Sequence, residues 1–156
     1  IWEGIPSQLL ERIRSYEQQI KTTMAVSVHI RRGDYLQNEE ASGGICTERY
    51  YKTAIEYVKK RQQDASFFVF TNDPDYAGEW ILKNFGQEKE QNGYLDLYLM
   101  SLCRHHILAN SSFSWWGAYL NPSREKMVIV PHKWFGNQEC RDIYMENMIR
   151  IAKEQS

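Results

Sequence analysis

The sequence has little of what marks extracellular, membrane-spanning or polyanion-binding proteins. Its three cysteines, Cys46, Cys103 and Cys140, are an odd number without metal-ligand spacing, which favours a reducing compartment over a disulfide framework. No apolar run approaches the roughly 20 residues that cross a bilayer, and the N-terminus lacks a signal-peptide pattern. The formal net charge of −1 gives no reason to expect nucleic acid or an acidic membrane surface as a partner.

What is present fits one compact domain. The 156 residues, 42% of them hydrophobic, can bury a substantial core, so we expect a single domain over residues 1–156. Aromatic residues make up 13% of the chain, which is compatible with a dense aromatic core or with stacking on sugars or bases. The chain starts at Ile1 rather than at a methionine, so we expect a fragment or a processed piece.

Short apolar runs alternate with helical patterns along the chain. Each run is too apolar to face water, which is typical of a parallel sheet covered on both faces, an α/β Rossmann-like fold. We expect strands at residues 22–30, 67–71, 106–109 and 127–130. We expect a first helix capped by Ser7 and a second one capped by Thr47. Further helices are expected over 75–85, over 95–104, through Trp115 and Trp116, which should pack on the sheet, and over 142–153.

Three polar loops follow the expected strands, at residues 31–34, 72–75 and 110–114. In open α/β sheets, ligands bind outside the carboxyl ends of the strands. We therefore expect these three loops to lie together and to form the binding site.

The first loop carries adjacent arginines. Arg31 and Arg32 come directly after a buried strand, and a guanidinium binds phosphate bidentately and stays charged. The alternative is that one of them pairs with Asp34 or another core carboxylate. The Arg-Gly-Asp tripeptide at 32–34 also matches a cell-adhesion motif, a short and weak match.

The third loop precedes a helix and is rich in hydroxyls. Ser112 and Ser114, with the free N–H groups of a helix N-terminus, would form an anion site. Ordinary helix capping by either serine is the alternative. Asn110 starts a glycosylation sequon, which we expect to be unused at the mouth of a site.

The second loop holds Asp73 and Asp75. An Asp-x-Asp pair after a strand can bind a divalent ion on a nucleotide diphosphate. Against this, Asp75 stands where a helix N-cap is expected, and Pro74 separates the two carboxylates. Because arginine can neutralise the phosphates, we expect no metal.

Blocks of the sequence resemble one enzyme family. His29-Ile30-Arg31-Arg32-Gly33-Asp34-Tyr35 resembles the His-x-Arg-Arg-x-Asp signature of the α-1,2-fucosyltransferases of glycosyltransferase family 11. The stretch 96–103, followed by 109–120 with its Ser-Phe-Ser-Trp-Trp-Gly-Ala run, resembles that family's second long block. Phe70-Thr71-Asn72-Asp73-Pro74 is similar to the block between them. The resemblance covers residues 24–131.

The resemblance implies a two-domain, GT-B-like, inverting and metal-independent enzyme that uses GDP-fucose as donor and needs no cofactor. Its C-terminal Rossmann-like domain binds the nucleotide, and this chain covers only that part. The N-terminal, acceptor-side domain would be absent, which leaves activity of the isolated chain open. The acceptor would be a galactose-containing oligosaccharide. Members from animals carry a membrane anchor and bacterial ones do not. Cysteine usage favours a cytoplasmic, bacterial-type protein, with membrane association open.

The resemblance also implies roles for single residues. Arg31 would contact the β-phosphate and act in catalysis, while Arg32 would bind substrate or brace the loop through Asp34. His29 and Asp73 match positions that recognise guanine. Ser112, Phe113 and Ser114 would meet the phosphates.

The catalytic base is assigned by spacing. Glu39 lies ten residues after His29, where related α-1,6-fucosyltransferases place a glutamate; a solvated loop glutamate is the alternative. Two functions stay open: transfer of fucose to a galactose 2-hydroxyl, or a GDP-sugar or anion-binding module without catalysis. A lectin-like function is a third, more distant one.

Overall fold

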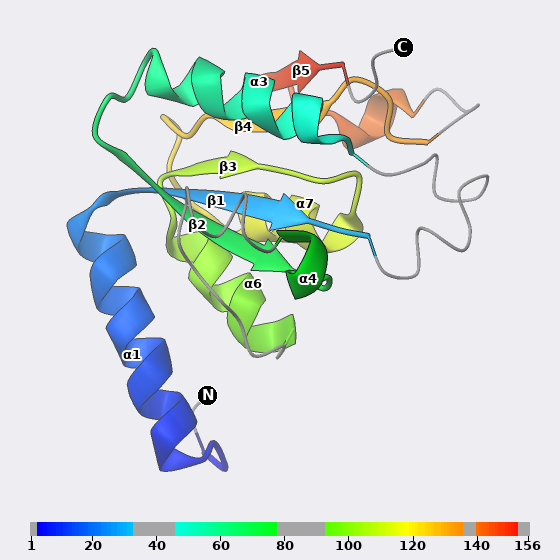
Figure 1. Cartoon of the computed structure of the whole chain (residues 1–156). Coiled ribbons are helices and arrows are strands. Elements are labelled where there is room, and N and C mark those ends of the chain that lie inside the picture. The colour runs from blue at the N-terminus through cyan, green and yellow to red at the C-terminus, as the bar shows by residue number, and fades with distance from the viewer. Residues whose placement is uncertain (1–2, 33–45, 78–92, 136–139, 153–156) are drawn as a thin grey trace.

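The computed structural model of the protein describes residues 3–32, 46–77, 93–135 and 140–152. Within them lies a sheet of five parallel strands (Figure 1), which confirms the α/β prediction. The strands are β1 (Met24–Ile30), β2 (Ala65–Thr71), β3 (His105–Ile107), β4 (Val128–Pro131) and β5 (Met148–Ile151).

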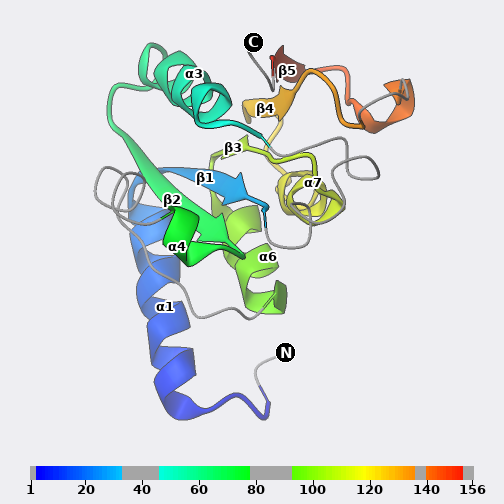
Figure 2. The same cartoon turned by 45° about the vertical axis from the view of Figure 1, so that its right-hand side comes forward.

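Helices cover both faces of this sheet. In the described part of the chain they are α1 (Ser7–Thr22), α3 (Glu48–Lys59), α4 (Pro74–Ala77), α6 (Gly93–Leu102) and α7 (Ser112–Tyr119). Figures 1 and 2 show α1, α6 and α7 on one face and α3 on the other. The parallel strands need this double cover because both of their faces are apolar.

Alternation along the strands divides the core into two sides. On β1, Val26, Val28 and Ile30 pack with α3, while Ala25 packs with α1 and α6. The register Met24↔Ala65 to Ile30↔Thr71 aligns β1 with β2 over the whole length of both strands. His29 lies four residues after Ala25, so both side chains point to the same face of the strand, opposite to Val28. His29 is therefore on the α6 and α7 side of the sheet.

The strand order is β2-β1-β3-β4-β5. The next strand after β1, β2, pairs on one side of it, and β3 pairs on the other. This is the flavodoxin-like doubly wound order, in which the crevice outside the carboxyl ends of β1 and β3 is the usual ligand site. The strand order therefore predicts a ligand site at the crevice between the ends of β1 and β3.

Local contacts explain how two helices are held. Thr47 caps α3 as predicted, because its hydroxyl accepts a hydrogen bond from Tyr50 N at 3.3 Å. Gly117 lets α7 approach α6 closely, since a Cβ there would lie 3.0 Å from Met100 Cε. The prediction that Ser7 caps α1 is wrong: Pro6 is the N-cap, and no side chain caps that helix.

The expected C-terminal helix over 142–153 is also wrong. Residues Arg141–Ile143 form a single 3₁₀ turn, η3, and Met148–Ile151 forms β5. β5 supplies backbone partners to β4, whose outer edge would otherwise be unpaired. Ile149 and Ile151 pack on the α3 side and Met148 on the α7 side, so the segment alternates as a strand.

Candidate functional site

The predicted loops meet at the carboxyl edge of the sheet. Arg31 and Arg32 follow β1, Asn72 and Asp73 follow β2, and the segment 108–111 joins β3 to α7. Asp34 and Glu39 lie outside the described residues. The described parts of the three loops therefore surround the β1–β3 crevice.

Arg32 is a brace between the first two loops. Its backbone N–H donates to Asn72 Oδ1 at 3.0 Å, and its guanidinium lies 3.5 Å above the Tyr76 ring. Its Nε also lies 3.5 Å from Asp73 Oδ2. The guanidinium is thus held by a cation–π contact and an ion pair. Sequence reasoning expected Asp34 as its brace and did not identify Asn72 or Tyr76.

Asp73 is tied into its own turn. Its Oδ1 accepts from Tyr76 N at 3.1 Å, and its N–H donates to Thr71 Oγ1 at 2.9 Å. It therefore caps α4, and Pro74 takes the first helical position that proline favours. The expectation that Asp75 is the N-cap is wrong. No group of three or more His, Cys, Asp or Glu in the described ranges is placed to hold a metal ion.

His29 is buried with an unsatisfied ring nitrogen. The residue is 4% exposed, and no described group makes a hydrogen bond to Nδ1. The Phe113 ring lies 5.6 Å away, centroid to centroid. Burial, with the nearby charge of Arg31 as second cause, lowers the pKa of His29 to about 3. The imidazole is therefore neutral at pH 7 and can both donate and accept.

The N-terminus of α7 presents backbone donors. Its N-cap residue, Ser111, makes no side-chain capping bond, and the first turn contains no acidic residue. The N–H groups of the first turn have no helical acceptor, and they form the positive end of the helix dipole. An anion at this position would satisfy them.

The three predicted residues of this turn are placed differently. Ser112 is exposed and Phe113 half-buried. Ser114 is fully buried, and its hydroxyl points back to the carbonyls of Ala109 and Ser111, at 3.2 and 3.1 Å. Its side chain therefore holds the loop in shape, and only its backbone N–H belongs to the donor group of the turn.

Asn110 fixes the same loop from the other side. It is 2% exposed; its Nδ2 donates to Trp134 O at 3.2 Å, and its Oδ1 accepts from Cys46 Sγ at 3.6 Å. This agrees with the expectation that its sequon is unused, since the amide is buried and bonded. Sequence reasoning missed this role because polarity alone gives no sign of burial.

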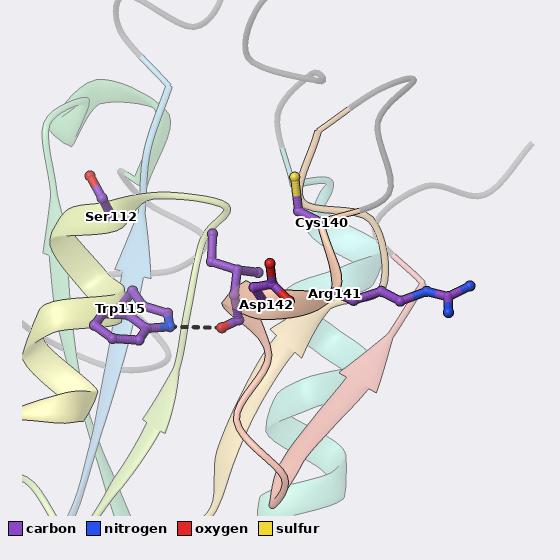
Figure 3. Close-up of a pocket in the computed structure, with 6 residues that line it drawn as sticks. Ser112, Trp115, Cys140, Arg141 and Asp142 are labelled. Carbon is purple, nitrogen blue, oxygen red and sulfur yellow. Dashed lines mark hydrogen bonds between the residues drawn. The ribbon is translucent and has the colours of Figure 1, made fainter.

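A pocket opens beside the first turn of α7. It has a volume of about 620 Å³ and is lined by Ser112, Trp115, Cys140, Arg141, Asp142 and Ile143. Figure 3 shows the Trp115 indole facing the 140–143 segment, with the Ser112 and Arg141 side chains directed away from the space between them. Trp115 Nε1 donates to Ile143 O at 2.8 Å. The pocket thus lies at the same edge of the sheet as the crevice.

The two tryptophans of α7 differ. Trp115 packs against Leu108, Ala118 and neighbouring core residues, as predicted. Trp116 is 49% exposed, so the expectation that it packs on the sheet is wrong. It lies on the outer side of a helix whose inner side is taken by Ser114, Gly117 and Ala118. No helix of the described chain is both long and apolar enough to cross a membrane.

Comparison with known proteins connects this geometry to one family. The family model described as "Glycosyl transferase family 11" matches residues 7–152. An α-1,2-colitosyltransferase of Escherichia coli is 41% identical over 144 residues, which are 86% of this chain and 50% of that protein. The O-antigen biosynthesis glycosyltransferase WbnK of Escherichia coli is 36% identical over 135 residues, 80% of this chain and 44% of that protein.

A more distant relative comes from an animal. The galactoside α-(1,2)-fucosyltransferase 1 of Saimiri boliviensis boliviensis is 28% identical over 120 residues, 72% of this chain and 33% of that protein. The chain thus spans half, or less than half, the length of these relatives.

Proposed function

The chain belongs to glycosyl transferase family 11, and from that premise we propose that it is the donor-binding part of a galactoside α-1,2-fucosyltransferase. The proposed donor is GDP-fucose, and the proposed acceptor is the 2-hydroxyl of a galactose in an oligosaccharide. The observation that supports this most is that the segment 29–32 at the end of β1 and the uncapped N-terminus of α7 lie at the same edge of the sheet, with the His29 and Phe113 rings 5.6 Å apart.

The charges at this edge support diphosphate binding. Arg31 carries a positive charge beside His29, and the first turn of α7 offers N–H donors and the positive end of the helix dipole. Arg32, held by Tyr76 and Asp73, would keep the Arg31 backbone in place. These groups would neutralise the diphosphate without a metal ion.

Base recognition would come from the neighbouring side chains. Neutral His29 has one buried nitrogen without a described partner, which suits a hydrogen bond to a purine edge. Asp73 is proposed to accept from the guanine N1–H and amino group. Because its two oxygens already contact Tyr76 N and Arg32, it would have to use the remaining lone pairs of those oxygens.

Catalysis would stabilise charge on the leaving GDP. As the bond between the sugar and the phosphate oxygen breaks, negative charge grows on the diphosphate next to Arg31. A pre-placed donor of this kind contributes about 3 kcal/mol or more to transition-state stabilisation. The acceptor hydroxyl would attack from the opposite side of the sugar, which inverts the anomeric carbon, and would pass its proton to a base. Glu39 is the proposed base.

The transferred sugar has a second candidate. The relative that is 41% identical is a colitosyltransferase, so a colitose donor competes with GDP-fucose in this proposal. A third possibility is a GDP-sugar-binding module that does not transfer sugar.

Nucleotide titration and a transfer assay test the proposal together. With excess EDTA, calorimetry should show GDP binding more tightly than ADP or UDP. Incubation with a galactose-terminated acceptor and labelled GDP-fucose should then give an α-1,2-linked product. Binding that requires added magnesium would contradict the metal-independent site, and tighter ADP binding would contradict guanine recognition. GDP binding without transfer would favour the non-catalytic module.

A further inference from the structure

The pocket beside α7 is preformed. Its aromatic wall, Trp115, is fixed by the bond from Nε1 to Ile143 O at 2.8 Å. The same indole stacks on the Tyr119 ring, 5.0 Å between centroids with the planes 10° apart. Because the wall is held by a hydrogen bond and a stacked ring, little ordering is needed when a ligand enters.

The pocket lies on the far side of α7 from the proposed base-binding residues. The 140–143 segment precedes β5, next to β4, whereas His29 and Asp73 lie at the ends of β1 and β2, the other side of the sheet order. Ser112, the first residue of α7, borders the pocket. A diphosphate bound at the first turn of α7 would therefore lie between the pocket and the proposed base-binding residues, His29 and Asp73.

The lining suits an uncharged, polar ligand with apolar patches. Trp115 and Ile143 form an apolar wall, and Asp142 contributes a carboxylate. Arg141 also lines the pocket, but its side chain is directed away from Trp115. A carboxylate repels a phosphate but accepts hydrogen bonds from two adjacent hydroxyls. Monosaccharides combine such hydroxyls with apolar C–H surface, and a few placed polar groups on an apolar wall are typical of small-ligand pockets.

We propose that this pocket, formed by Ser112, Trp115, Asp142 and Ile143 and by Cys140 at its rim, is the subsite for the sugar of the nucleotide-sugar donor. The inference rests on the proposed function, since it takes the diphosphate at α7 as its starting point. It adds that Asp142 hydrogen-bonds the sugar hydroxyls and that Trp115 supports the apolar face of the sugar. It also places nucleoside and sugar on opposite sides of α7.

Cys140 provides a reporter for occupancy of the pocket. It is partly exposed, whereas Cys46 and Cys103 are 2% and 1% exposed, and burial raises the pKa of the Cys103 thiol. A maleimide should therefore modify Cys140 selectively, because the reactive species is an accessible thiolate. GDP-fucose and GDP are compared, each at ten times its own dissociation constant from calorimetry on the same sample.

GDP-fucose should slow the modification of Cys140 about tenfold, the factor expected when ten-elevenths of the sites are occupied, and GDP should leave the rate within about twofold. The matched control is the Cys140→Ser/Ser123→Cys variant, whose thiol lies in the exposed loop before β4 at the opposite edge of the sheet. Neither ligand should protect that thiol. Equal protection of Cys140 by both ligands, or protection by neither, would overturn the sugar assignment.

Substitution of Asp142 separates this inference from the proposed function. Asp142→Asn should weaken GDP-fucose about tenfold, as loss of a charge-assisted hydrogen bond does, and leave GDP affinity unchanged. Glu146→Gln, an exposed carboxylate four residues away that does not line the pocket, should change neither affinity. Unchanged GDP-fucose affinity in Asp142→Asn would refute the pocket assignment alone. Absence of GDP binding in the unmodified chain would refute the proposed function, and the pocket assignment with it.

Discussion

Three histidines of the sheet are buried, and two of them, His29 and His106, have very different surroundings. Burial is the main cause that lowers the pKa of each to about 3. His106 is bonded at both ring nitrogens, to Ser27 Oγ and Asn121 Nδ2, each at 2.8 Å. His29 Nδ1 has no such partner in the described chain. A buried polar atom left unpaired costs stability, and a ligand in the crevice beside α7 could pair with this one.

Replacing each histidine by phenylalanine should therefore have opposite effects on stability. His29→Phe should leave the melting temperature unchanged or raise it, because a buried unpaired nitrogen, which costs about 1–3 kcal/mol, is removed. The same variant should lose GDP affinity by about tenfold or more, as a hydrogen-bond partner of the base disappears. Differential scanning calorimetry and GDP titration measure the two quantities.

His106→Phe is the control. It leaves Ser27 Oγ and Asn121 Nδ2 without their partner, so the melting temperature should fall. A His29→Phe variant that melts lower than His106→Phe, with GDP affinity intact, would mean that His29 is a structural residue and Asp73 alone reads the base.

For single residues, the sequence predicts which side chains are candidates for binding better than it predicts which contacts they make. Adjacent guanidinium groups after an apolar strand made Arg31 and Arg32 candidates, and the resemblance to family 11 added His29. It could not identify Tyr76 as the ring under Arg32, since that contact depends on where β2 pairs. Nor does the amino-acid sequence show that the Ser114 hydroxyl points back to the carbonyl of Ala109.

Helix α7 is the element on which the account depends. Its eight residues are exposed at Ser112 and buried at Ser114 and Gly117, and its N-terminus has neither a capping side chain nor an acidic first turn. Both omissions cost helix stability, typically about 1 kcal/mol for a missing cap. The absence of a cap and of an acidic residue is explained if a bound anion accepts hydrogen bonds from the free N–H groups of the first turn.

The Ser112→Asp variant tests whether an anion binds at the start of α7. A carboxylate in the first turn should stabilise the helix by about 0.3–1 kcal/mol through the dipole, so the melting temperature should rise slightly. It should weaken GDP binding by about tenfold or more, because it repels the diphosphate at short range. Both measurements are compared with Ser123→Asp, in an exposed loop away from α7. Equal GDP affinity in the two variants would place the diphosphate elsewhere.

Element boundaries were predicted within a few residues for the first four strands, and the failure at the C-terminus has a specific cause. The helical spacing of Met145, Met148 and Ile149 is compatible with an amphipathic helix. The structure uses the same segment as β5 because β4 offers an unpaired edge and because Ile149 and Ile151 fit the α3 side. The pairing of β5 with β4 joins residues far apart in the sequence, so no local sequence pattern indicates it.

For the whole molecule, the histidines predict a loss of stability in acid. Folding lowers the pKa of His29 and of His106 from an ordinary value of 6.5 to about 3. The unfolded chain therefore binds more protons below pH 6.5, and stability falls as the pH drops from 6.5 toward 3. Each histidine should contribute a loss of about 2 kcal/mol between pH 7 and pH 5.

Urea unfolding at pH 7 and pH 5 measures this loss. Carboxylates titrate in the same range, so the comparison is between the unmodified chain and His29→Phe, which removes one of the two histidines. The difference in stability between the two pH values should be about 2 kcal/mol smaller in His29→Phe. Identical differences in the two proteins would show that His29 is not buried in its neutral form in solution.

The parallel α/β architecture follows from strands too apolar to face water, and it confirms the prediction made from their composition. The order of the strands was not predictable, because the apolar runs carry no sign of which neighbour each will pair with. That order decides the location of the site, since it places the β1–β3 crevice beside α7. The predicted roles of Asp34 and Glu39 stay predictions.

The central claim is that arginine and the start of α7 bind a diphosphate without a metal ion, and Arg31→Lys tests it most directly. Lysine keeps the charge and loses the planar fork. GDP titration in excess EDTA should show affinity about tenfold to a hundredfold weaker than in the unmodified chain. Arg124→Lys, in an exposed loop, should bind as the unmodified chain does, with matching melting temperatures for all three proteins. An Arg31→Lys variant that melts normally and binds GDP equally well would contradict the claim.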